Sequence, residues 1–209
     1  MTRAVFLDAL GTLLELEPPW TSLRERLPSG VSDWRLISAL RAEMAYYREH
    51  AHEGRDEASL RELRERCAAV VSDQLGIEVA VEELVEAIRF RVYPDVIPAL
   101  DALGSRGVKL IAVSNWDYAL PRVLDRCGLG ERLDGTVTSA AVGARKPDPA
   151  IFSAALQLAG CAAAEALHVG DTAEEDVAGA RAAGIRALLI DRDGRAGDIS
   201  SLREIDQHL

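Results

Sequence analysis

The residue types that do chemistry stand where apolar, strand-like runs of this sequence end. Asp8 follows the first such run directly, and Asp171 ends a later one. Ser114 and Asn115 end a run that lies between them, and Lys146 lies in a loop just before a helix-like stretch. Because ligands of open parallel sheets bind at the carboxyl ends of the strands, we expect these side chains to share one crevice.

A carboxylate, a hydroxyl, a lysine and a second carboxylate in one crevice are suited to phosphoryl chemistry. Asp8 would attack as a nucleophile and form an aspartyl intermediate. Ser114 and Lys146 would hold the oxygens of the transferring group. Asp8 and Asp171 would share a magnesium ion, which takes oxygen ligands and keeps several waters. The pattern therefore predicts a magnesium-dependent site for a phosphorylated ligand.

The last two thirds of the chain alternates strand-like with helix-like stretches. Strands are expected over 108–115, 167–171 and 186–191, after a first strand at 5–7, and helices over 95–107, 149–160 and 173–184. Each helix-like stretch ends in glycine, as helix C-termini commonly do. Alternation of this kind indicates an α/β fold, with a Rossmann-like parallel sheet and helices on both faces.

Residues 15–92 break this alternation. Apolar side chains there recur at helical spacing in three segments, 36–47, 60–70 and 84–88. No strand is evident between them. We therefore predict an inserted, all-helical cap domain at 15–92, and an α/β core domain formed by residues 1–14 and 93–209. The many Arg and Glu residues of the insert read as a solvated helix surface.

The net charge and the cysteines narrow the class of protein. The 209 residues carry a formal net charge of −10, which argues against nucleic acid or an anionic membrane as a partner, because polyanion binding depends on lysine and arginine. No apolar run approaches the roughly 20 residues that cross a bilayer, and the N-terminus lacks a signal-peptide pattern. Three scattered cysteines indicate reduced thiols. We expect a cytoplasmic protein.

Four motifs resemble those of the haloacid dehalogenase-like (HAD) hydrolase superfamily. In chain order they are Asp8-x-x-Gly11-Thr12, Ser114-Asn115, Lys146-Pro147 and Gly170-Asp171-x4-Asp176. Each stands beside an expected strand, and together they span nearly the whole chain. The resemblance implies a Rossmann-like core, a mobile helical cap inserted after the first strand, dependence on Mg2+ and Asp8 as the nucleophile.

The resemblance also implies ligands for the metal and contacts for the substrate. The metal set is Asp8, the backbone carbonyl of Leu10, Asp171 and Asp176. Ser114 and Lys146 complete the catalytic set. Substrate contacts are expected from Thr12 and Asn115, and from the cap candidates Arg41, Tyr46, Tyr47 and Arg48.

Two of the acidic segments also have structural interpretations. Thr172–Glu175 has the capping-box pattern, a hydroxyl three residues before a glutamate. This leaves three roles open for Asp176, which are metal ligand, organiser of the loop and acid of the first helical turn. Asp148, directly before Pro149, is expected to cap the helix that follows.

Leu10 departs from the pattern of most phosphatases of the superfamily, which place an aspartate two residues after the nucleophile. That aspartate protonates the leaving alkoxide and then activates water, and losing such a group typically costs about 10²–10⁴-fold in rate. Aryl and acyl phosphates, which have good leaving groups, would suffer least. A water, or Tyr46, Tyr47 or His50 of the cap, would have to take its place.

Leu10 also keeps two other functions open. A 2-haloacid dehalogenase needs no proton for its halide leaving group, which fits leucine, but these dehalogenases work without metal and lack the Gly-Asp-x4-Asp acids. Without a cation, Asp171 and its neighbouring acids would repel a carboxylate substrate and raise one another's pKa. The third function is a catalytically feeble homologue that binds a phosphorylated ligand or a protein partner. We favour a Mg2+-dependent phosphatase that acts on a small phosphorylated metabolite.

Overall fold

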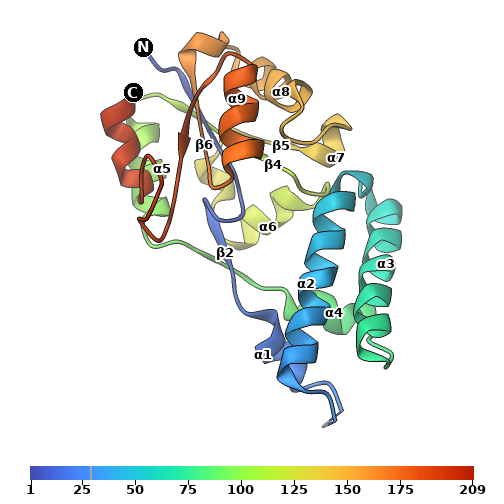
Figure 1. Cartoon of the computed structure of the whole chain (residues 1–209). Helices are drawn as coiled ribbons and strands as arrows, with labels where there is room; N and C mark the ends of the chain where they lie inside the picture. The colour runs from blue at the N-terminus through green and yellow to red at the C-terminus, as the bar shows by residue number, and fades with distance from the viewer. Residues whose placement is uncertain (29) are drawn as a thin grey trace.

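The computed structural model describes residues 1–28 and 30–209. A five-stranded sheet forms its centre, in the order β5-β4-β1-β6-β7, and each neighbouring pair is parallel (Figure 1). The strands are β1 (Ala4–Leu7), β4 (Lys109–Ser114), β5 (Gly135–Thr138), β6 (Ala166–Gly170) and β7 (Arg186–Leu189). The predicted α/β fold with a parallel sheet is confirmed.

The first strand lies at the centre because all four of its residues are apolar and fully buried. Such a run is typical of a strand that is covered on both faces. Leu7 pairs with Ala112 of β4 on one side and with Val169 of β6 on the other. The register brings the ends of all three strands to one edge, where the polar residues that follow them meet.

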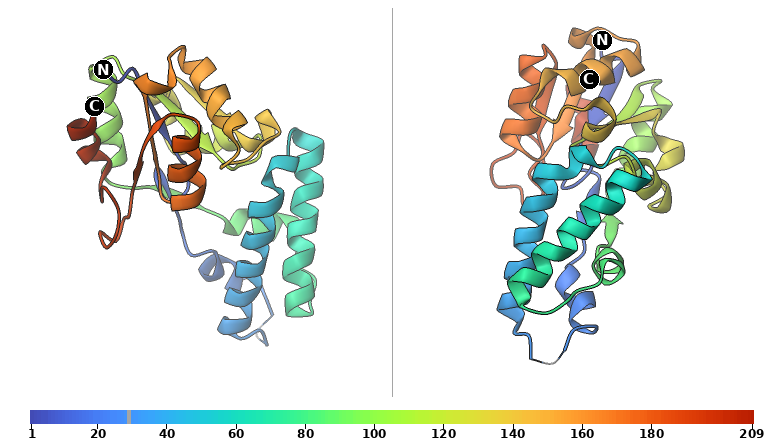
Figure 2. Two further views of the ribbon diagram at one scale, coloured as in Figure 1. Left: turned by 45° about the horizontal axis from the view of Figure 1, so that its top comes forward. Right: turned by 90° about the vertical axis from the view of Figure 1, so that its right-hand side faces the viewer.

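Alternation along the strands divides the core into two layers. Phe6 packs in the same cluster as side chains of α8 (Pro149–Ala159) and α9 (Gly179–Ala182). Val5 and Leu7 face the opposite layer. That layer consists of α5 (Val96–Ser105), α6 (Leu120–Arg126) and the C-terminal 3-10 helix (Leu202–His208). Helices therefore cover both faces of the sheet (Figure 2).

The inserted region between β1 and the rest of the sheet is built mainly of helices. They are α1 (Pro19–Arg24), α2 (Asp33–His50), a 3-10 turn (Ala51–Glu53), α3 (Glu57–Leu75) and α4 (Val81–Ala87). The two long helices, α2 and α3, pack side by side (Figures 1 and 2). Asp56 caps α3 by accepting a hydrogen bond from the backbone N–H of Ser59 (2.9 Å). The insert has its own apolar core, separate from the two layers around the sheet.

The expectation of three helices and no strand in 15–92 is wrong in two respects. A fourth helix, α1, is present, and β2 (Leu14–Leu16) pairs antiparallel with β3 (Phe90–Val92) in a small second sheet. Each of these strands has only three residues, too few to show an alternating pattern. They form where the chain passes between core and insert, so their pairing depends on contacts far apart in the sequence.

Two other parts of the core differ from the sequence expectations. β5, together with α6 and the short α7 (Ser139–Val142), fills a stretch for which no element was predicted. The expected helix 173–184 is a π-helical segment, Ala173–Ala178, followed by the single turn of α9.

Within 1–28 and 30–209, none of the helices combines the length and the apolar character that crossing a membrane requires.

Candidate active site

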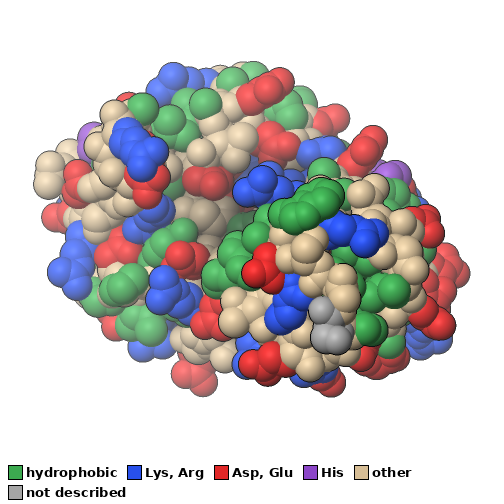
Figure 3. All heavy atoms as spheres, turned by 60° about the horizontal axis from the view of Figure 1, so that its bottom comes forward, with side chains coloured by type: hydrophobic (Ala, Val, Ile, Leu, Met, Phe, Trp, Pro, Cys, Tyr) green, Lys and Arg blue, Asp and Glu red, His purple; other side chains and the backbone are tan. Residues whose placement is uncertain are grey.

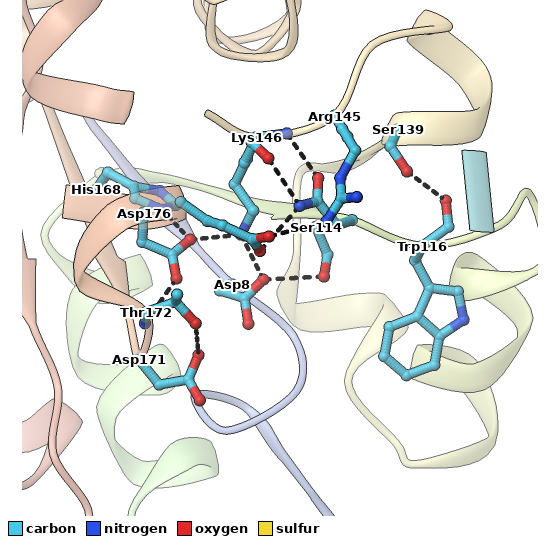
Figure 4. Close-up of polar contacts among 12 residues, drawn as sticks. Asp8, Ser114, Trp116, Ser139, Arg145, Lys146, His168, Asp171, Thr172 and Asp176 are labelled. Atoms are coloured by element: carbon cyan, nitrogen blue, oxygen red, sulfur yellow. Dashed lines mark hydrogen bonds and ion pairs between the residues drawn. The ribbon is translucent and has the colours of Figure 1, made fainter. Parts of the chain in front are cut away.

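Asp8 lies one residue beyond β1, at the edge where the strands end. Its Oδ1 accepts hydrogen bonds from Ser114 Oγ (2.9 Å) and Lys146 Nζ (2.6 Å) (Figure 4). Among the described residues, Asp8 Oδ2 receives no hydrogen bond. The residue is only 6% exposed, and this burial raises the pKa of Asp8 while the Lys146 ammonium opposes the rise. One oxygen is thus fixed in place and the other is free to react or to bind a cation.

Lys146 is a buried cation between two carboxylates, and not a surface residue. It is 1% exposed, and its Nζ pairs with Oδ1 of both Asp8 and Asp176. Burial alone would lower the pKa of Lys146, but the two carboxylates outweigh it and raise that pKa. Asn115 fixes the backbone of Lys146, because its side-chain oxygen accepts from Lys146 N (2.7 Å) and its amide donates to Lys146 O (3.1 Å).

Asp176 has both carboxylate oxygens engaged. Its Oδ1 pairs with Lys146 and with Nε2 of His168 (2.9 Å), and its Oδ2 accepts from the backbone N–H of Thr172 (3.0 Å). Lys146 and His168 outweigh the effect of burial and lower the pKa of Asp176. Of the three roles left open for this residue, these contacts favour the organiser of the loop, which also anchors Lys146.

The capping box predicted at Thr172–Glu175 does not form, and that prediction is wrong. The Thr172 hydroxyl donates to Asp171 Oδ1 (3.2 Å) and caps no helix. Glu175 accepts instead from Asn115 Nδ2 (3.0 Å) and from Arg145 Nη2 (2.9 Å). The reason is that site residues take up both side chains, Thr172 by Asp171 and Glu175 by Asn115 and Arg145. The predicted cap at Asp148 is confirmed, since its side chain accepts from Ala150 N (2.8 Å).

Asp171 approaches the backbone of the loop after β1 at Gly11. A Cβ atom at Gly11 would lie 2.0 Å from Asp171 Oδ2, and the φ of +85° is one that L side chains rarely adopt. Glycine is therefore required here for two separate reasons. Partial burial, followed by repulsion from Asp8 and Asp176, raises the pKa of Asp171 to about 6.

The acidic cluster has the donors that a hard divalent cation takes. One carboxylate oxygen each of Asp8, Asp171 and Asp176 lies within 4.8 Å of the others. No described group donates a hydrogen bond to the carbonyl oxygen of Leu10. Mg2+ prefers such oxygens, and the raised pKa of Asp171 is what crowded acids show without a cation. Because the Asp176 oxygens are already engaged, the other three donors fit a metal better.

A cavity of about 290 Å³ adjoins these residues and extends between the core and the insert. In Figure 3 the surface is hollowed between the two parts, with acidic and basic side chains at its border. The predicted site residues that line the cavity are Asp8, Leu10, Ser114, Asn115, Lys146, Asp171, Asp176, Tyr47 and Arg48. The structure thus brings most of the predicted residues together.

Thr12, Arg41 and Tyr46 do not line this cavity. Thr12 is fully buried in the loop after β1, and Arg41 is exposed on α2. The hydroxyl of Tyr46 contacts Nη1 of Arg66 (3.1 Å), and its ring lies 4.2 Å from that of His50. Their positions do not support the predicted contacts with a substrate.

Several residues that line the cavity were not predicted. Asp117 accepts a hydrogen bond from the Tyr47 hydroxyl (2.7 Å) and so joins the core to α2. Other unpredicted residues of the lining include Glu43, Arg64, Cys67, Trp116, Arg145 and Glu175. The α2 members, residues 40, 43, 44, 47 and 48, lie on one helical face. That spacing is visible in the sequence and could have identified Glu43.

The chain is similar over most of its length to haloacid dehalogenase-like hydrolases, whose family model matches residues 2–184. Haloacid dehalogenase-like hydrolase domain-containing protein 3 of Bos taurus is 46% identical over 85 residues, 41% of this chain and 34% of that protein. Phosphoserine phosphatase of Thermus thermophilus is 35% identical over 144 residues, 62% of this chain and 58% of that protein. The chain spans less than two thirds of either relative.

The fold is also similar to that of a solved dehalogenase. L-2-haloacid dehalogenase from Xanthobacter autotrophicus matches with a TM-score of 0.74, at 22% sequence identity, over 99% of this chain and 98% of that one. At this level of identity the likeness concerns the fold alone.

Proposed function

Because the chain belongs to the haloacid dehalogenase-like hydrolase family, we propose that it is a Mg2+-dependent phosphatase that acts on a small phosphorylated metabolite through Asp8. The observation that carries this proposal is the free Oδ2 of Asp8, next to a buried lysine and an acidic cluster. The similarity to a phosphoserine phosphatase supports the same reaction class.

Each residue of the site has a role in this reaction. Asp8 Oδ2 attacks phosphorus, the bond from phosphorus to the leaving oxygen breaks, and water later hydrolyses the aspartyl phosphate. Lys146 donates two of its three N–H groups to Asp8 and Asp176, so one is left for a phosphoryl oxygen. Ser114 has a single O–H, which would turn from Asp8 Oδ1 to the phosphoryl group. Mg2+, held by Asp8, Asp171 and the Leu10 carbonyl, would neutralise charge between the anionic nucleophile and the anionic substrate. Asp176 keeps Lys146 in place.

Among the described residues, none of those named as replacements for the missing aspartate is free to protonate the leaving group. Leu10 cannot donate, and the cap residues Tyr46 and His50 do not line the cavity. Tyr47 does line it, but its hydroxyl donates to Asp117, and burial raises the pKa of Tyr47 well above its usual value. We therefore expect a preference for substrates with good leaving groups, such as aryl and acyl phosphates.

Phosphate release from p-nitrophenyl phosphate and acetyl phosphate, with and without Mg2+, tests the proposal. Asp8→Asn should abolish the Mg2+-stimulated activity, a loss of about 10⁴-fold or more. Asp73→Asn, a matched change of an exposed residue on α3, should leave the activity unchanged. Undiminished turnover by Asp8→Asn, in a folded protein, would exclude Asp8 as the nucleophile.

A 2-haloacid dehalogenase is the second candidate, because leucine at position 10 suits a leaving group that needs no proton. The acids Asp171 and Asp176 stand against it. Chloride release from 2-chloropropionate in the absence of metal, without phosphate release from the esters, would support this function. Tight binding of phosphate without any turnover would instead support a non-catalytic homologue.

A further inference from the structure

One face of α2 supplies the cavity with a buried acid, Glu43. The α2 residues of the wall follow helical spacing, and Glu43 lies between the apolar Leu40 and Met44 on that face. It is only 6% exposed although it borders the cavity. Its side chain is therefore held among apolar groups and can be reached from the cavity.

Glu43 lacks a cationic partner. It takes part in no ion pair within 1–28 and 30–209. Within the same ranges its carboxylate accepts no hydrogen bond from a nitrogen or hydroxyl donor, and the neighbouring Cys67 thiol is a weak donor. Burial raises the pKa of Glu43 to about 7. A buried carboxylate of this kind is costly unless it is paired, so a cation that entered the cavity would satisfy it.

The rest of the insert wall is mostly apolar, and its basic groups lie away from Glu43. Its apolar members include Leu40, Met44, Leu60, Leu84, Val85 and Ile88. Arg48 is exposed. Arg64 is half-buried near Asp117, whose pKa is raised by burial while the charge of Arg64 opposes the rise. Neither of these arginines forms an ion pair with the Glu43 carboxylate. The wall thus offers an aliphatic surface with one unneutralised acid.

The two ends of the cavity are suited to groups of opposite charge. The core end has the buried cation Lys146 and, when loaded, a divalent metal, and it takes a phosphoryl group. The insert end has the acid of Glu43. We propose that Glu43 binds an ammonium group on the leaving portion of the substrate, so that the preferred substrates are small amino-bearing phosphate esters. This inference rests on the phosphatase activity proposed above, which the same experiment measures separately.

Inhibition of p-nitrophenyl phosphate turnover gives the test, because it does not require slow alkyl esters to react. The inhibitors are ω-aminoalkyl phosphonates of increasing chain length, each compared with the n-alkyl and ω-hydroxyalkyl phosphonate of equal length. We expect the best amino compound to bind about tenfold or more tightly than both partners, as hydrogen bonds to charged groups allow. Glu43→Gln, which keeps the shape and removes the charge, should abolish this preference.

Glu49→Gln is the matched control, an exposed glutamate on the same helix that does not line the cavity. It should keep both the turnover and the preference for the amino compound. Equal inhibition by all three inhibitors in the wild type would overturn the inference, and so would a preference that survives in a folded Glu43→Gln. Preference for the hydroxyl compound would also overturn it. If the wild type fails to turn over p-nitrophenyl phosphate, the proposed function falls and the inference falls with it.

Discussion

The two ends of the cavity differ in how their polar groups are satisfied. At the core end, Asp8, Lys146 and Asp176 are joined by ion pairs, and Asn115 holds the loop that carries the lysine. At the insert end, the Glu43 carboxylate is buried without an ion pair among the described residues, beside the weakly donating Cys67 thiol. The charged groups at the core end are paired before any ligand binds. The carboxylate at the insert end has no cationic partner unless a ligand supplies one.

This difference assigns the reaction to the core end of the cavity and the choice of substrate to the insert end. A network of ion pairs can hold a nucleophile in one orientation. Its members come from the turn after β1 (Asp8), the loop between α7 and α8 (Lys146) and the π-helical segment after β6 (Asp176). The insert contacts the core through hydrogen bonds of side chains, from Tyr47 to Asp117 at the cavity and from Tyr118 to Glu57 outside it. We expect changes at the core end to alter the rate for every substrate, and changes at the insert end to alter the choice among substrates.

The largest effect should come from Lys146→Met, which breaks the paired network. Removing one partner of a buried ion pair costs about 3–5 kcal/mol in stability, and losing a donor to the transferring group costs about 10²–10³-fold in rate. Urea unfolding and phosphate release measure the two effects. The comparison between the two ends would fail if the variant kept normal turnover of all substrates.

Leu10→Asp should raise activity at the core end. An aspartate at this position can protonate a leaving alkoxide, so turnover of alkyl phosphates should increase by about 10²-fold, the lower end of what general acid catalysis contributes. Acetyl phosphate, whose leaving group needs no proton, serves as the internal reference and should change little. An unchanged ratio of alkyl to acyl turnover, in a protein that still binds Mg2+, would contradict the role assigned to the missing acid.

Mg2+ affinity should depend on pH through Asp171. Its pKa of about 6 lies above the ordinary 3.8, so the carboxyl is protonated and unable to bind metal below about pH 6. Affinity should therefore fall by about tenfold for each pH unit below that value and level off above it. Calorimetric titration with Mg2+ from about pH 5 to 8 measures this. Asp171→Asn should bind weakly throughout, and an equally steep fall in that variant would assign the proton to another group.

At the insert end, Glu43→Gln should stabilise the protein at high pH. The pKa of Glu43 in the folded protein is about 7, above the ordinary 4.5, so Glu43 ionises at lower pH in the unfolded chain than in the folded one. The free energy of unfolding therefore decreases as the pH rises from about 4.5 to 7. The variant should match the wild type near pH 4 and exceed it by up to about 3 kcal/mol near pH 8. Urea unfolding at both pH values, with Glu49→Gln as reference, checks the difference.

The sequence predicted the core end better than the insert end, for a physical reason. Asp8 and Asp171 directly follow apolar strands and Ser114 ends one, so a local sequence pattern was enough to predict that they meet at one edge of the sheet. The role of Asp176 depends on Lys146 and His168, which meet it only in the folded sheet. Glu43 was overlooked because a glutamate on a helix rich in Arg and Glu usually faces water, and its burial comes from packing against α3.

The pairing of β2 with β3 has a consequence for how such a protein can change. Leu14 lies opposite Val92 and Leu16 opposite Phe90. The two chain segments that connect the insert to the core therefore run side by side. A segment joined at neighbouring points can be lengthened, shortened or replaced by another without altering the strand order of the host. The core with its catalytic residues can then stay unchanged while the insert, and with it the choice of substrate, varies.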